Sequence, residues 1–127
     1  MPCPYCRVPT KSRYIFAMKN QTLREIQKQV DDWITEIGHG YWTPHEMLAR
    51  LVEEVGETAR LINHLYSPKK KKDSEPDQQL SDELADILFA VICLANSHNI
   101  DLQEAFEKMM EKYSLRDKER YKSDNNN

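Results

Sequence analysis

The feature that most constrains the fold of this chain is a run of apolar residues from position 84 to position 95. The run reads LADILFAVICLA, and Asp86 is its one residue that is not apolar. An apolar stretch of this length, without alternation, indicates a helix rather than a strand. A helix that is hydrophobic all round must be surrounded by other elements. The run therefore predicts that Asp86 places a carboxylate in an apolar environment.

The rest of the chain also predicts helices, so we expect an all-α fold. Apolar residues recur at helical spacing in the expected helices, which cover residues 22–37, 44–66, 79–97 and 102–113, the last fraying through 114–122. Thr22 and Thr43 each stand before a helix with a Glu three residues later, a capping-box pattern. Strand-like alternation and internal repeats are absent from the sequence. The expected architecture is a bundle of four to five helices.

Length and charge limit the class of protein. The 127 residues fit one domain, in which we expect a disordered leader over 1–18, a helical domain over 19–122 and a disordered tail over 123–127. Charged residues make up 31% of the chain and the net charge is −3, unlike the basic balance of a nucleic-acid binder. No apolar run reaches the roughly 18 residues of a membrane span, and no secretory signal is evident. We therefore expect a cytoplasmic protein that binds neither nucleic acid nor membrane.

The three cysteines point to no catalytic thiol. Cys93 lies in the apolar run and is predicted to be a core thiol. Cys3 and Cys6 form one Cys-x-x-Cys pair, which without a second pair or paired histidines is half a zinc site at best. We interpret the segment before Met18, which holds this pair, as an extension without a function of its own.

Carboxylates at spacing i and i+3 are the strongest chemical signal. Glu54 interrupts an apolar stripe of the helix over 44–66, and Glu57 follows one turn later; Glu83 and Asp86 repeat the arrangement. Such pairs are common on exposed faces, and Glu57 and Glu83 alone would suggest nothing more. Burying unpaired carboxylates is very unfavourable, however, and a divalent cation such as Mg²⁺, which prefers oxygen ligands, removes the conflict. The pattern predicts a metal site between two helices of a bundle.

The same residues carry a family resemblance. The segments EEVGE and DELAD resemble the E-E-x-x-E … E-x-x-D signature of MazG-like nucleotide pyrophosphohydrolases. The likeness extends through LANSHNID and KYSLRDKERY, and over residues 19–122 the chain is similar to the short, single-domain YpjD branch found in bacilli. The resemblance implies the all-α NTP pyrophosphohydrolase fold, completed by oligomerisation into a homodimer or homotetramer. It also implies Mg²⁺-dependent hydrolysis of a nucleoside triphosphate to the monophosphate and pyrophosphate, with Mn²⁺ as an alternative metal.

The resemblance assigns roles residue by residue. It implies the metal ligands Glu54, Glu57, Glu83 and Asp86. Glu53 fills the first motif position and is the candidate that orients or deprotonates water. The substrate-binding candidates are the phosphate-binding Lys112 and Arg116, together with Asn96 and Trp42. A solvated helix end for the two cations and a helix cap for Asn96 remain open alternatives.

The base-binding slot is less defined. Tyr41 and His64 are further candidates to line it, whereas Trp33 is expected in the core. Some relatives have a Trp where this chain has Gly38 and a Tyr where it has Ala90. Two alternatives to a house-cleaning enzyme for nucleotides stay open. One is phosphoribosyl-ATP pyrophosphohydrolase, and the other is a non-catalytic helical interaction module.

Overall fold

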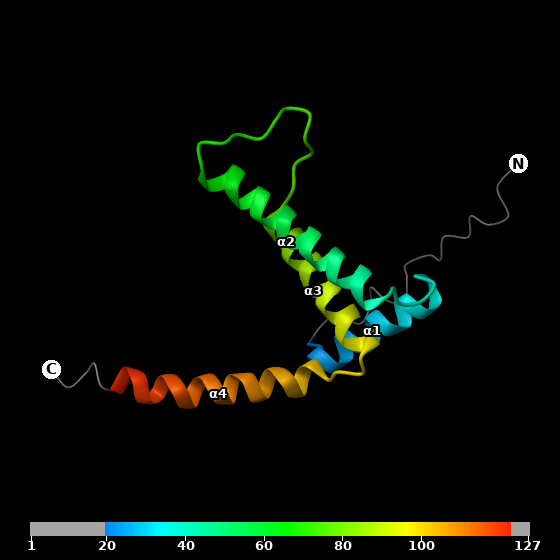
Figure 1. Cartoon of the computed structure of the whole chain (residues 1–127), viewed down its shortest axis with the longest axis vertical. Coiled ribbons are helices and arrows are strands. Elements are labelled where there is room, and N and C mark those ends of the chain that lie inside the picture. The colour runs from blue at the N-terminus through cyan, green and yellow to red at the C-terminus, as the bar shows by residue number, and fades with distance from the viewer. Residues whose placement is uncertain (1–19, 123–127) are drawn as a thin grey trace, which may run out of the picture.

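The structure, a computed structural model, describes residues 20–122. Within this range the chain has no strand and forms the helices α1 (Leu23–Glu36), α2 (Pro44–Tyr66), α3 (Leu80–Ser97) and α4 (Leu102–Lys122) (Figure 1). The prediction of an all-α fold is confirmed, with four helices in this range where four to five were expected. No helix among these residues combines the length and hydropathy needed to cross a membrane. The expected leader and tail, and with them Cys3 and Cys6, lie outside the described residues.

Both of the first two helices begin with the predicted capping box. The Thr22 side chain accepts a hydrogen bond from the backbone N–H of Glu25, and the Glu25 carboxylate accepts one from the backbone N–H of Thr22. Thr43 and Glu46 make the same reciprocal pair at the start of α2. These bonds satisfy backbone donors that a helix start otherwise leaves without partners.

A tight turn joins α1 to α2. A Cβ on Gly38 would lie 3.1 Å from the Cα of Ile34, so only glycine lets the chain return this close to α1. Gly40 follows with a φ of +97°, in the region that favours glycine. The turn brings the start of α2 back against α1, where the core lies.

The α2 and α3 helices form a long antiparallel hairpin, joined by the loop over residues 67–79, and α1 packs across the end opposite this loop (Figure 1). At that end Ile34, Met47 and Cys93 are buried against one another, with partly buried Val30, Tyr41 and Leu94 around them. Cys93 is thus the predicted core thiol, and burial raises its pKa to about 11. The hairpin leaves the middle of α2 and α3 paired with each other only.

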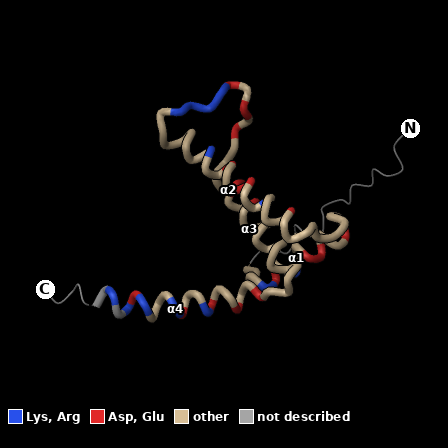
Figure 2. Tube along the Cα trace, viewed as in Figure 1, with Lys and Arg blue, Asp and Glu red and all other residues tan. Residues whose placement is uncertain are grey.

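The last helix differs most from the prediction. It does not fray after residue 113 but continues to Lys122, leading away from the hairpin as a separate arm (Figure 1). No glycine or proline interrupts residues 102–122, and pairs one turn apart support the helix, such as Lys108 with Glu104 at 2.6 Å. Figure 2 shows both signs of charge interleaved along this arm, and a run of lysines in the loop after α2.

The described residues do not surround the apolar helices on all sides. Leu84, Leu88 and Phe89 on α3 are exposed by 52%, 47% and 39%. The outer face of α2 is equally open, with Val52 exposed by 62%. Within residues 20–122, the expectation that α3 is covered on all sides is therefore not met, which affects the surroundings of Asp86.

Candidate metal centre and adjoining pocket

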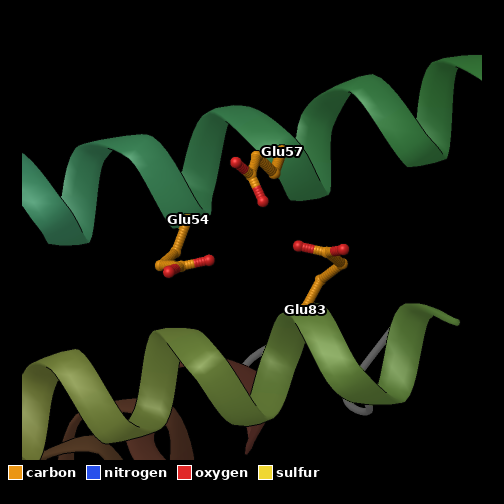
Figure 3. A group of neighbouring side chains, drawn as sticks. All are labelled: Glu54, Glu57 and Glu83. Carbon is orange, nitrogen blue, oxygen red and sulfur yellow. The ribbon is translucent and has the colours of Figure 1, made fainter. Parts of the chain in front are cut away.

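The antiparallel pairing of α2 and α3 brings carboxylates of the two helices together. Glu54 and Glu57 lie one turn apart on α2, and Glu83 faces them from α3 (Figure 3). One carboxylate oxygen of each residue lies within 4.8 Å of the other two. We call these three residues the carboxylate cluster.

Two members of the carboxylate cluster are buried without enough partners. Glu54 is 2% exposed and Glu83 is 4% exposed. The Oε2 atom of each is buried and has no hydrogen-bond partner. Leaving buried carboxylate oxygens unpaired is costly, so the fold holds here an arrangement that the chain alone does not stabilise.

The electrostatics of Glu54 follow from this position. Burial raises the pKa of Glu54, the neighbouring Arg50 guanidinium lowers it, and the negative charges of Asp86, Glu57 and Glu83 raise it further. Arg50 pairs with the Oε1 atom of Glu54 but leaves Oε2 without a partner. A divalent cation between the two helices would supply the missing positive charge to several oxygens at once. The donor set therefore fits a hard metal ion.

Asp86 requires a correction, because it is exposed rather than buried. The flanking apolar residues predicted a covered position, but α3 is covered by α2 on one face and by α1 at one end only. Asp86 lies outside the group of three that share a spacing of 4.8 Å. It is nevertheless close enough to raise the pKa of Glu54, and both residues line one pocket. The two helices thus bring Asp86 to the border of the carboxylate cluster.

Glu53 points to a different surface from its neighbour. Its side chain is 65% exposed, and its Oε2 atom lies 3.5 Å from Nη1 of Arg50. It is not a member of the carboxylate cluster. Arg50 therefore bridges the buried Glu54 and the exposed Glu53.

A pocket of about 340 Å³ adjoins the carboxylate cluster. Its aromatic lining comes from α1, the α1–α2 turn and α3, and consists of Trp33, Tyr41, Trp42 and Phe89. Gly38 and Ala90 line it with small side chains, and Arg50, Glu54 and Asp86 contribute charged groups. An apolar pocket with a few polar groups is the usual form of a small-molecule site.

The position of Trp33 also differs from the prediction. We expected it in the core, but it is 38% exposed and packs edge-on against Phe89 with ring centroids 5.8 Å apart. Both rings line the pocket. Helical spacing alone could not separate these positions, because a pocket wall and a core present the same apolar pattern in a sequence. His64 is not part of this lining and lies 3.9 Å from Glu75 of the loop over 67–79.

Asn96 takes part in a hydrogen-bond network between α1 and α3. Its Oδ1 accepts from Nε2 of Gln27 at 2.9 Å, and its Nδ2 donates to the backbone oxygen of Gln27 at 2.9 Å and to the Tyr41 hydroxyl at 3.1 Å. The Tyr41 hydroxyl donates to Asp31 at 2.7 Å, and burial raises the pKa of Tyr41. Asn96 therefore reaches the pocket wall through Tyr41.

Gln27 completes this network and was not identified from the sequence. It is 7% exposed, and its Oε1 accepts from the backbone N–H of Leu102 at 2.8 Å, at the start of α4. Its Nε2 donates to the backbone oxygen of Ile100. A glutamine within a surface-like helical pattern gives no signal of this contact, since the partners lie more than 65 residues away in the sequence.

The predicted phosphate-binding cations lie on the arm formed by α4. Lys112 and Arg116 are exposed, and α4 leads away from the carboxylate cluster of its own chain (Figure 1). Arg116 pairs with Asp117 at 2.9 Å and lies over the Tyr113 ring at 4.8 Å. One chain therefore does not bring these two cations together with the four predicted metal ligands.

The fold and the carboxylate cluster define a class of protein, and comparison with known families agrees. The family described as MazG nucleotide pyrophosphohydrolase domain matches residues 42–121. This match spans more than half of the chain and includes every residue of the carboxylate cluster. The chain belongs to the MazG nucleotide pyrophosphohydrolase family.

Individual relatives narrow the comparison. The chain is 45% identical over 104 residues to YpjD of Bacillus subtilis (strain 168), an uncharacterized protein, covering 82% of this chain and 94% of YpjD. The crystal structure of YpjD from Bacillus subtilis superimposes with a TM-score of 0.68 at 42% identity, over 78% of this chain and 99% of that one. The Bacillus-conserved MazG protein, a nucleotide pyrophosphohydrolase, has a crystal structure that superimposes with a TM-score of 0.62 at 42% identity, over 76% and 92%.

Proposed function

We propose that the chain hydrolyses a nucleoside triphosphate to the monophosphate and pyrophosphate in the presence of Mg²⁺, with Mn²⁺ as an alternative. The observation that carries the proposal is the carboxylate cluster, in which Glu54 and Glu83 each bury an oxygen without a partner. Membership of the MazG family supports the same reaction. The related Bacillus-conserved MazG protein is itself a nucleotide pyrophosphohydrolase.

The metal ligands in this proposal are Glu54, Glu57 and Glu83, joined by Asp86 from the border of the cluster. A bound ion would polarise phosphoryl oxygens and favour the ionised form of a water molecule. Glu53 is the proposed proton acceptor, since it precedes Glu54 in the sequence, shares Arg50 with it and has a carboxylate that is open to solvent. The water oxygen attacks the α-phosphorus, its proton passes to Glu53, and the bond to the bridging oxygen breaks so that pyrophosphate leaves.

The pocket is the proposed place of the base. A cavity of about 340 Å³ lies within the range of small-molecule sites, which is roughly 300 to 1,000 Å³. Trp42 is 60% exposed and lines the pocket, so its ring is available to stack on a base. Because Glu54 and Asp86 line the same pocket, a base held there would have its phosphates near the carboxylate cluster. Asn96 supports the pocket wall through Tyr41 rather than by a free amide group.

Self-association into a homodimer or homotetramer is part of the proposal. The outer face of α2 carries exposed residues in alternating steps of four and three, namely Leu48, Val52, Val55, Ala59, Ile62 and Tyr66. This spacing forms a seam that suits packing against another helix. Leu84 and Leu88 extend the open apolar surface onto α3. An equivalent surface on a second copy would cover it, because symmetric association pairs like with like.

A partner chain would also give Lys112 and Arg116 their proposed role. The arm formed by α4 leads away from its own cluster, so these cations reach phosphates only where a neighbouring subunit's cluster lies beside the arm. Phe106, Met110 and Tyr113 are exposed on the same arm by 54%, 46% and 42%. An isolated helix with this much open apolar surface favours packing against a partner.

Product analysis tests the proposal. The chain is incubated with each common NTP and dNTP, and with phosphoribosyl-ATP, in Mg²⁺ or in EDTA, and the products are identified by phosphorus NMR. We expect monophosphate and pyrophosphate with Mg²⁺, and none with EDTA. Release of orthophosphate would indicate attack at another phosphorus. No hydrolysis of any nucleotide by folded protein would favour the interaction module, and a reaction limited to phosphoribosyl-ATP would favour the biosynthetic enzyme.

A further inference from the structure

Arg50 has no role in the reaction proposed above. It lies one turn before Glu54 on α2, and its Nη2 atom pairs with Oε1 of Glu54. Its Nη1 atom lies 3.5 Å from Oε2 of Glu53. The Arg50 side chain is 50% exposed and lines the pocket next to the carboxylate cluster. It therefore connects a buried carboxylate, an exposed carboxylate and the pocket.

The two side chains of the Arg50–Glu54 pair differ in their exposure to solvent. Glu54 is 2% exposed and cannot find another cation by moving, whereas Arg50 is half exposed and has a flexible side chain. Without metal, the Arg50 guanidinium is the positive group that pairs with this buried carboxylate. Removing one member of such a pair leaves a buried charge without compensation. Arg50 thus stabilises the cluster when no metal is bound.

A metal ion and Arg50 would both place a positive charge next to the carboxylate of Glu54. Arg50 pairs with Oε1 of Glu54, and a metal ion would bind the unpartnered Oε2 of the same carboxylate, so two positive charges would lie close together and repel each other. Metal binding at Glu54 therefore competes with the Arg50 pair. A released Arg50 would remain tethered at the pocket, with its planar group of donors open to solvent.

We propose that Arg50 is a substrate-binding residue that exchanges partners: it holds Glu54 without metal, and when metal binds it turns to the triphosphate of the nucleotide. This inference rests on the proposed function. Guanidinium groups match phosphate geometry with two parallel hydrogen bonds, and the pocket places Arg50 beside Glu54 and Asp86, where the phosphates would lie. The same side chain would thereby link occupation of the metal site to binding of the substrate.

The test compares Arg50→Met with Lys28→Met. Lys28 also pairs with a carboxylate at i+4, namely Asp32 at 2.7 Å, but both side chains are exposed, on α1. The two variants lose the same charge, so a difference between them reflects the buried partner. Mn²⁺ binding to the nucleotide-free protein is measured by electron paramagnetic resonance, and KM and kcat are measured on the best substrate of the wild type.

For Arg50→Met we expect Mn²⁺ to bind about threefold to tenfold more tightly, because its competitor for Glu54 is gone. We expect KM for the nucleotide to rise about tenfold, with a smaller change in kcat, because a phosphate contact is lost. Lys28→Met should match the wild type in all three measurements. Arg50→Lys keeps a charge near Glu54 but loses the planar donors, so it should bind Mn²⁺ like the wild type and still show a raised KM.

Two results would overturn the inference. Mn²⁺ binding by Arg50→Met that is unchanged or weaker than in the wild type would show that Arg50 does not compete with metal. An unchanged KM in both Arg50 variants would show that it does not bind the triphosphate. If the wild type hydrolyses no nucleotide, the proposed function fails, whereas the Mn²⁺ comparison still decides whether Arg50 and metal compete. Circular dichroism verifies that each variant is folded.

Discussion

At the scale of single residues, the chemistry of the chain is concentrated in two buried carboxylates. Glu54 and Glu83 are held by opposite helices, and each keeps one buried oxygen without a partner. Buried polar atoms in a protein core normally have a hydrogen-bond partner. The presence of these two oxygens between two packed helices, α2 and α3, indicates that the fold is adapted to an additional positive group at this point.

The pH dependence of stability without metal follows from Glu54. Its pKa is raised above the ordinary value of 4.5, with burial as the largest cause. The folded chain therefore holds this proton more tightly than the unfolded chain does. The stability associated with neutral Glu54 is present below pH 4.5 and is lost as pH rises through the raised pKa of the folded state.

Urea unfolding in EDTA across this pH range measures the effect. We expect the unfolding free energy of the wild type to fall as pH rises above 4.5, more steeply than that of Glu54→Gln, in which the ionising group is absent. Saturating Mg²⁺ should remove the difference in slope. Parallel curves for the two proteins in EDTA would show that Glu54 ionises as easily in the folded chain as in the unfolded one.

The Asp86→Asn variant tests separately whether Asp86 affects activity through the metal and whether it affects stability. Because Asp86 is exposed, the stability of this variant in EDTA should lie within about 0.5 kcal/mol of the wild type. Loss of a carboxylate at the border of the cluster should lower kcat/KM by roughly 100-fold. Chemical unfolding and steady-state kinetics check the two parts. A large gain in stability would mean that Asp86 is buried in the assembled protein.

The sequence was a good guide to some residues and a poor guide to others. Spacing of three residues correctly placed Glu54 and Glu57 on one face, because helix geometry fixes that relation locally. The exposure of Asp86 could not be predicted, since its apolar neighbours do not show which element covers each side of the helix. The contacts of Gln27 depend on the packing of distant helices, which leaves no local pattern.

At the scale of helices, local signals determine where elements begin and end. The capping boxes at Thr22 and Thr43 set the starts of α1 and α2, and Gly38 allows the close return between them. The predicted bounds of these helices therefore agree with the structure within a residue or two. The predicted end of α4 at residue 113 is too early, because helix formers continue without interruption to Lys122.

The start of α2 offers a test of this local control. Thr43→Ala removes a side chain that accepts from the backbone N–H of Glu46 and should reduce the unfolding free energy by about 1 kcal/mol. Thr35→Ala, at an exposed position within α1, should lie within about 0.5 kcal/mol of the wild type. Urea unfolding at one fixed protein concentration compares them. Equal stabilities for the two variants would contradict a role for the cap.

At the scale of the whole molecule, the chain presents more apolar surface than a lone domain of this size normally leaves open. The seam on α2, the open face of α3 and the arm formed by α4 are all exposed in one chain. The sequence analysis did not identify the seam, and one sequence cannot state whether such a face meets another helix of the same chain or a second copy. Among the residues that the structure describes, no other helix of the same chain covers this face.

Self-association is tested by placing a charge in the seam. Val52→Glu introduces a carboxylate at a site that is 62% exposed in one chain and would be buried in an assembly. We expect light scattering at micromolar concentration to give a dimer or tetramer for the wild type and a smaller species for this variant. Thr35→Glu adds the same charge at an exposed position of α1 and should leave the mass of the assembly unchanged. A monomeric wild type would contradict the proposed assembly.

The carboxylate cluster is proposed to hold the metal that hydrolysis requires. The most direct test of this proposal is pyrophosphate release from the best nucleotide substrate as a function of Mg²⁺, for Glu83→Gln and Asp82→Asn beside the wild type. The two altered residues are neighbours on α3, but Glu83 is buried in the cluster and Asp82 is exposed. We predict Mg²⁺-dependent release by the wild type and Asp82→Asn, and loss of release in Glu83→Gln and in EDTA. Release by Glu83→Gln at the wild-type rate, or release that persists in EDTA, would contradict a role for the carboxylate cluster in metal binding.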